Sequence, residues 1–113
     1  MSDNAKLLKT WLPMTETAFY ILLALLEPRH GYGITKFVED LTAGRIKLGS
    51  GTIYGTLTKL TRDGLIEIYD NSDKRTVYRI TDSGREILHA ESERMRNVYE
   101  DLSAVEKQMG EKL

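Results

Sequence analysis

The sequence predicts a mainly helical domain that contains one β-hairpin and ends in a long helix. Apolar residues recur at the three- and four-residue spacing of amphipathic helices through the first half of the chain. Two short segments, 65–69 and 76–80, flank a polar turn and predict a β-hairpin. The residues from about 82 to 112 are enough for a helix of roughly 45 Å. For 113 residues we expect one α+β domain with an additional element.

The N-terminal part is predicted to form two helices. Residues 5–12 place three leucines and a tryptophan on one helical stripe, and Pro13 interrupts this segment. Thr15 is a suitable N-cap for the next helix, about 15–27. This second helix is apolar on all sides, so we expect it to be buried, and Pro28 ends it.

Two further helices are predicted in the middle of the chain. Residues 31–41 carry apolar side chains on one helical face and are followed by a Thr-Ala-Gly sequence. Residues 45–48 alternate between polar and apolar side chains, which predicts a short strand. Ser50 is expected to cap the next helix, which runs to about Asp63, because Gly64 suits the position just after a helix.

The order of the predicted elements indicates a winged helix-turn-helix domain, in which three helices precede a β-hairpin. The turn at 70–75 is the polar tip of the hairpin. Thr81 is expected to cap the final helix. We therefore divide the chain into a winged-helix part with an N-terminal helical extension, 1–81, and a coiled-coil-like C-terminal helix for dimerisation, 82–113.

The helix predicted over about 50–63 has one apolar face and one face suited to nucleic acid. At 100° per residue, Ile53, Leu57 and Leu60 form a buried stripe. The opposite face combines glycines, which let the backbone come close, with hydroxyls and cations that can bind phosphates or base edges. An ordinary solvated face is the alternative. Cations at the hairpin tip favour DNA, because a wing needs positive charge near the DNA backbone. The candidate DNA-binding residues are Lys36, Ser50, Thr52, Tyr54, Gly55, Thr58, Lys59, Arg62, Lys74 and Arg75.

The charges are unevenly distributed along the chain, so its slightly negative net charge does not describe each segment. The net charge is −1 and the pI is about 6.1, which by themselves argue against a nucleic-acid partner. Residues 81–113 contribute −3 of this, whereas the stretch from Leu41 to Arg62 holds four cations and no acid. We therefore expect the acidic C-terminal arm to point away from DNA, and nonspecific affinity to be weak at physiological salt.

Several function classes are excluded or disfavoured. The chain has no cysteine, which rules out a disulfide framework and mildly favours the cytoplasm. Its longest apolar run, Ala18–Leu26, has nine residues, too few for a membrane span. The two histidines, His30 and His89, have no metal-ligand spacing, and His30 suits a packing or capping role. We find no nucleophile–base constellation, so we expect neither an enzyme nor a cofactor.

The final helix carries an apolar seam. Seven-residue spacing predicts a partly coiled-coil-like surface, for which the segment 5–12 is an obvious second element. We expect a homodimer that places two DNA-facing helices about 34–36 Å apart and prefers an inverted repeat. Truncation after Arg85 is expected to give a monomer. The candidate interface residues are Leu8, Trp11, Leu88, Met95, Val98, Tyr99, Leu102, Val105 and Met109.

Six motifs in the order in which they occur resemble one known family. They are Leu12–Leu26, His30-Gly31-Tyr32-Gly33, Gly44–Leu48, Gly49–Leu57, Gly64-Leu65-Ile66-Glu67 and Tyr78–Gly84. Together they resemble PadR-type transcriptional regulators over about residues 12–85. The resemblance implies a winged-helix repressor that binds double-stranded DNA as a homodimer until an effector releases it. It places the recognition helix at 51–60, with its Tyr54-Gly55 pair, and the wing tip at 70–75. Ser50 departs from the family, which often has proline there.

The sequence leaves two questions open: which effector binds, and whether the protein represses or activates transcription. Some short members of the family bind flat aromatic drugs through tryptophan stacking between their C-terminal helices, but residues 82–113 contain no tryptophan. Trp11, Met95 and Tyr99 are candidates for lining a site for a small aromatic or drug-like effector, although core packing is the preferred role for Trp11. The rival function is a winged-helix module for protein–protein contacts that does not bind DNA. An activator, or a regulator without an effector, is also compatible with the sequence.

Overall fold

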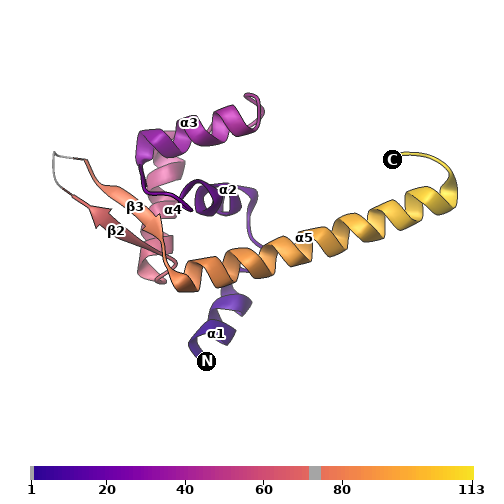
Figure 1. Cartoon of the computed structure of the whole chain (residues 1–113), viewed down its shortest axis with the longest axis horizontal. Coiled ribbons are helices and arrows are strands. Elements are labelled where there is room, and N and C mark those ends of the chain that lie inside the picture. The colour runs from indigo at the N-terminus through magenta and orange to yellow at the C-terminus, as the bar shows by residue number, and fades with distance from the viewer. Residues whose placement is uncertain (1, 72–74) are drawn as a thin grey trace.

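The computed structural model describes residues 2–71 and 75–113, with side chains from Asn4 onward. Helices predominate in this part of the chain, and a three-stranded antiparallel sheet lies beside them (Figure 1). The mainly helical fold with a winged helix-turn-helix is therefore confirmed. The elements are α1 (Ser2–Trp11), α2 (Glu16–Ala24), β1 (Arg29–His30), α3 (Gly31–Leu41), α4 (Ser50–Arg62), β2 (Ile66–Asp70), β3 (Val77–Ile80) and α5 (Asp82–Met109).

The central helix α2 begins as predicted and ends earlier than expected. The Thr15 hydroxyl accepts a hydrogen bond from the Ala18 N–H at 3.1 Å, which makes Thr15 the N-cap. The helix ends at Ala24, and the Leu25 carbonyl then accepts a hydrogen bond from the Ile80 N–H at 2.9 Å. The segment after α2 is thus bonded to the sheet, which the sequence analysis did not anticipate.

The sheet has the strand order β1-β3-β2, with both pairs antiparallel. The hairpin of β2 and β3 is confirmed to within a residue at each end. The third strand is not where the sequence placed it. Residues 45–48 form no strand, whereas Arg29 and His30 pair with Tyr78 and Val77 on β3. A two-residue strand has no detectable alternation, and its pairing depends on the tertiary fold.

The core lies where α2, α3, α4, the sheet and the start of α5 meet. Its fully buried members include Ile21, Leu22, Ile34, Leu57 and Ile87. The buried apolar residues of α2, α3 and α4 form one contiguous cluster with the start of α5, whereas the predicted apolar seam of α5 beyond Leu88 is exposed. Burial of this cluster is the main term that stabilises the orientation of α4.

The sequence predicted the C-terminal end of α4 correctly, but it predicted the wrong residue for the N-cap. Gly49 is the N-cap residue and makes no side-chain cap hydrogen bond, so Ser50 is the first helical residue and its predicted capping role is wrong. At the other end, Gly64 has a φ of 76°, which its lack of a Cβ allows. The Leu65 N–H then bonds to the Leu60 carbonyl at 2.9 Å, and the Gly64 N–H bonds to the Thr61 carbonyl at 3.0 Å.

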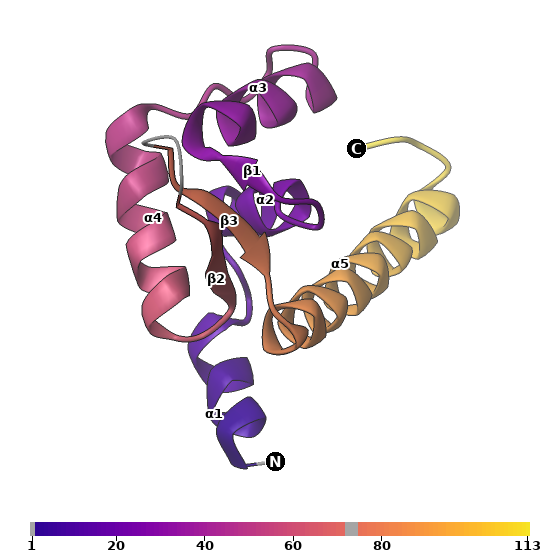
Figure 2. The ribbon, with the colours of Figure 1, turned by 60° about the vertical axis from the view of Figure 1, so that its left-hand side comes forward.

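The long helix α5 belongs only in part to the winged domain. Thr81 caps it as predicted, accepting a hydrogen bond from the Gly84 N–H at 3.1 Å. Its first turns are buried through Gly84, Ile87, Leu88 and Glu91. The remaining turns project beyond the other elements in both views of the ribbon (Figures 1 and 2). In the described part of the chain, no helix is both long and apolar enough to cross a membrane.

Candidate nucleic-acid interface

The helix α4 presents the face that the sequence predicted. Ile53, Leu57 and Leu60 are buried, with at most 1% of their surface exposed. The residues on the other side, among them Gly51 and Gly55, are exposed. A Cβ placed on either glycine would meet no atom within 4 Å. The backbone of α4 is therefore open to a close partner along this face, and Figure 2 shows the helix at the edge of the domain.

The polar groups on this face differ in how free they are. The Thr58 hydroxyl donates to the Tyr54 carbonyl at 2.8 Å, so its proton is already used within the helix. Lys59 is exposed and has no carboxylate partner among the residues that the structure describes. Arg62 differs, because its Nε lies 3.3 Å from the carboxylate of Asp63. Lys59 is thus the freer cation for an anionic ligand.

Asp63 also holds Trp11. The indole Nε1–H of Trp11 donates to Asp63 Oδ2 at 2.9 Å, and the ring packs against the core. Met95 and Tyr99 are exposed on α5, by 41% and 68%. The described contacts of Trp11 are therefore with the core and with the end of α4. These contacts agree with core packing, which the sequence favoured as the role of this residue. Its candidate roles in dimerisation and effector binding stay predictions.

Tyr54 lies between α4 and the start of α3. A Cβ placed on Gly31 would come within 2.6 Å of the Tyr54 hydroxyl, so the absence of a side chain at Gly31 makes room for the ring. The side chain of Tyr54 remains 53% exposed. Burial raises the pKa of the neighbouring Tyr78, and Tyr54 raises it further. The Tyr78 phenol is therefore a neutral hydrogen-bonding group at neutral pH.

The wing contributes Arg75 to the same side of the domain. Its Nη1 lies 3.1 Å from Nε2 of His30, which belongs to β1. Lys74, the other predicted wing cation, lies outside the described residues. Lys36 lies on α3 rather than on α4 or the wing, and its ammonium is paired with Asp40 at 3.3 Å. The contact of all these side chains with DNA stays a prediction.

His30 and Tyr32 adjoin this site, although the sequence analysis proposed neither for it. His30 caps α3 as anticipated, since its Nδ1 accepts the Gly33 N–H at 3.2 Å. Tyr32 is 71% exposed and stacks on the His30 ring, with centroids 6.3 Å apart. Only the pairing of β1 with β3 brings His30 to the wing, so no local pattern could have placed it there.

The predicted dimer surface is mostly exposed. Leu8 is 38% exposed, and the apolar residues of the seam from Met95 to Met109 range from 41% to 68%. Leu88 differs, because it is 7% exposed and belongs to the core of its own chain. The free seam therefore starts one heptad later than the sequence indicated. Among the described residues, no group of three or more histidines, cysteines or carboxylates could hold a metal ion.

The fold and this cationic face define a winged helix-turn-helix protein with a projecting C-terminal helix. Residues 21–90 match the model of the transcriptional regulator PadR-like family, and the chain belongs to that family. The family is one of transcriptional regulators and not of enzymes.

Three similar proteins illustrate the relationship. The chain is 31% identical to the transcriptional regulator YqjI of Escherichia coli K12 over 75 residues, which cover 66% of this chain and 36% of that one. A transcriptional regulator from Clostridium thermocellum has a similar structure, with a TM-score of 0.71, 26% identity, and coverage of 78% of this chain and 87% of that one. Bacillus subtilis PadR in complex with operator DNA gives a TM-score of 0.58 and 30% identity, over 69% of this chain and 47% of that one. The chain matches only 21% to 36% of the length of its curated relatives.

Proposed function

We propose that this chain is a dimeric repressor that binds promoter DNA in the cytoplasm and is released by a small-molecule effector. The observation that carries the proposal is the exposed face of α4, where open glycines lie beside Lys59, which has no carboxylate partner among the described residues. The relative from Bacillus subtilis, whose structure is a complex with operator DNA, supports the same assignment.

In this proposal α4 enters the major groove and the wing contacts the flanking backbone. Gly55 allows close approach, and Lys59 and Arg62 bind phosphates or guanine edges. Ser50 and Thr52, at the start of α4, add hydroxyls near its free N–H groups. The proposed contact set is completed by Tyr54, Thr58, Lys36, Lys74 and Arg75.

The proposed dimer uses the part of α5 that projects from the domain. A stripe that includes Val98, Leu102 and Val105 is exposed by 41% to 53%, which is unusual for a monomer. The N-terminal helix α1 contacts α5, so exposed Leu8 lies on an element beside it. In this arrangement residues 1–81 bind DNA and residues 82–113 join the subunits, except that the first turns of α5 also complete the core of the winged part.

The test is selection from a random duplex library, followed by anisotropy titrations at several salt concentrations. We expect an inverted repeat whose half-site centres are about one helical turn, or a multiple of it, apart. Lys59→Ala should weaken binding. It should also reduce the salt slope, which is the steepness of the fall in log K with log salt concentration, by about 0.9, as for the loss of one phosphate contact. The matched control is Lys107→Ala, on exposed α5, which should change neither.

Enrichment of no sequence, with binding that is absent or insensitive to salt, would instead support the protein–protein interaction module. Repression and its release are tested separately, with a reporter placed behind the selected sequence. Reporter output should fall when the protein is expressed and recover with an inducing compound. A rise in output on expression would indicate an activator.

A further inference from the structure

A small recess lies where the wing, the start of α3 and α4 meet. It has a volume of about 320 Å³ and is lined by His30, Tyr32, Tyr54, Arg75 and Thr76. These five residues, which we call the wing–helix recess, come from three separate parts of the sequence. Among the residues that the structure describes, the lining contains a guanidinium, an imidazole, two phenols and a hydroxyl, and no carboxylate. This composition favours an anionic ligand over a cationic one.

The two nitrogens of His30 make the argument more specific. Nδ1 accepts the Gly33 N–H at 3.2 Å, and this bond caps α3. In a neutral ring only one nitrogen accepts, so the proton lies on Nε2 when Nδ1 is the acceptor. Nε2 in turn lies 3.1 Å from Nη1 of Arg75, which can only donate. Two donors therefore face each other across the recess, and no hydrogen bond joins them.

An acceptor that receives both protons removes this conflict. The oxygens of a phosphate group carry negative charge and accept several hydrogen bonds at once, so they suit a guanidinium beside an imidazole N–H. Arg29, a described cation next to His30, is already engaged. Arg29 donates to the Ala24 carbonyl at 2.7 Å and stacks on Phe37, whereas Arg75 has no carboxylate partner in the described part of the chain.

We propose that the wing–helix recess binds one phosphate of the DNA backbone, held jointly by the Nε2–H of His30 and the guanidinium of Arg75. This inference rests on the proposed function, because Tyr54 belongs both to the recess and to the exposed side of α4. A duplex that lies against α4 brings its backbone past the base of the wing. His30 thereby has two roles: one nitrogen caps α3, and the other binds the phosphate.

The first experiment separates the two roles of His30. His30→Ser keeps a side-chain oxygen for the N-cap and removes the group that reaches Arg75. We expect duplex binding about tenfold weaker, as for the loss of one hydrogen bond to a charged group. Arg75→Gln should lower the slope by about 0.9. The double variant should lose less than the product of the two single losses, because both groups hold one phosphate.

The second experiment observes the imidazole directly. Nitrogen-15 NMR distinguishes the tautomers of His30, and His89 on α5 is the internal control. We expect the Nε2–H form, with a shift of the Nε2 signal on addition of duplex DNA and none at His89. The Nδ1–H form in the DNA complex would overturn the proposal, because Nε2 would then only accept. If the Nε2 signal shifts with inorganic phosphate but not with duplex DNA, the phosphate that binds the recess does not come from the DNA backbone, and the proposal is wrong.

The outcomes also separate this inference from the proposed function. If Lys59→Ala weakens duplex binding and both His30→Ser and Arg75→Gln leave it unchanged, the recess binds no phosphate although the protein binds DNA. If the wild-type chain binds no duplex at all, both proposals are wrong. Thermal unfolding of each variant establishes that a loss of binding does not come from loss of the fold.

Discussion

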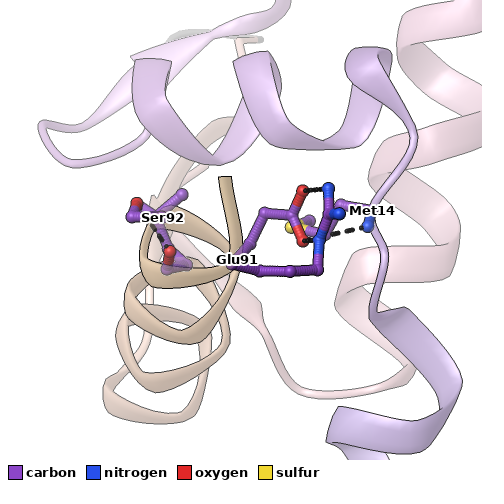
Figure 3. Close-up of polar contacts among 5 residues, drawn as sticks. Met14, Glu91 and Ser92 are labelled. Atoms are coloured by element: carbon purple, nitrogen blue, oxygen red, sulfur yellow. Dashed lines mark hydrogen bonds and ion pairs between the residues drawn. The ribbon is translucent and has the colours of Figure 1, made fainter. Parts of the chain in front are cut away.

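The Glu91 carboxylate on α5 accepts a hydrogen bond from the Met14 backbone N–H, across 3.3 Å, just before α2 begins (Figure 3). Glu91 is 2% exposed, although it lies on the helix that projects furthest from the domain. Arg94, one turn later, binds both of its carboxylate oxygens at 2.7 and 2.8 Å. The hydrogen bond between Glu91 and Met14 fixes α5 to the segment between α1 and α2. It thereby fixes the direction in which the exposed part of α5 leaves the domain.

Removal of the Glu91 carboxylate should destabilise the fold. Glu91→Ala leaves the Met14 N–H without its partner and opens space in a buried position, and we expect a loss of about 1–3 kcal/mol in the free energy of unfolding. Urea unfolding followed by circular dichroism measures it. The matched control is Glu93→Ala, whose pair with Arg96 is exposed at 3.5 Å and should contribute less than about 0.5 kcal/mol. Equal losses in the two variants would contradict the role given to Glu91.

The same carboxylate predicts a pH dependence of stability. The hydrogen bonds from Arg94 lower the pKa of Glu91, the Met14 N–H and the Arg94 charge lower it further, and burial opposes them in part. Because the folded pKa is depressed, the stabilisation is fully present above the ordinary glutamate pKa, about 4.3. It is lost as the pH falls through the lower folded value. Wild-type protein should therefore lose more stability between pH 5 and 3 than Glu91→Gln, as urea titrations at each pH would measure.

Gly84 is predicted to be intolerant of any side chain. A Cβ there would lie 2.0 Å from the Leu65 carbonyl oxygen and 2.7 Å from Ile80, so α5 would have to move off the sheet. We expect Gly84→Ala to cost about 3 kcal/mol in unfolding free energy. Gly55→Ala is the matched control within a helix, because nothing lies within 4 Å of its Cβ. That substitution should stabilise the free protein by up to about 1 kcal/mol, whereas its effect on DNA binding should be a loss.

Sequence patterns predicted the elements that depend on neighbouring residues. The caps at Thr15 and Thr81 and the end of α4 at Gly64 each depend on residues within one helical turn, and all three were found. The strand β1 and the second contact of His30 depend on Tyr78, Val77 and Arg75, more than forty residues away, and they were missed. The burial of Glu91, a charged residue on the projecting helix, was not predicted either. Its burial follows from where α5 meets the α1–α2 junction.

Gly31 should control the position of Tyr54. The Cβ of Gly31→Ala would lie 2.6 Å from the Tyr54 hydroxyl, at the end of a flexible side chain, so the ring can move aside at little cost. We expect a change in stability below about 1 kcal/mol together with weaker duplex binding in anisotropy titrations. Gly33→Ala, whose nearest contact is an ordinary 3.6 Å, should leave binding unchanged. Similar binding by both variants would show that the position of Tyr54 does not matter for DNA.

The exposed part of α5 offers the cleanest test of the dimer, and the structure changes how that test is made. Truncation after Arg85 would remove Ile87, Leu88 and Glu91 from the core, so the loss of the dimer could not be separated from the loss of the fold. Leu102→Glu places a charge within the apolar stripe instead, at a side chain that is 41% exposed in the free chain. Charges in such a seam oppose association, so light scattering should give a monomer with an unchanged circular dichroism spectrum. Ala104→Glu adds the same charge to an exposed position about 200° around the helix, and it should remain dimeric. A dimer that survives Leu102→Glu would place the interface on another surface.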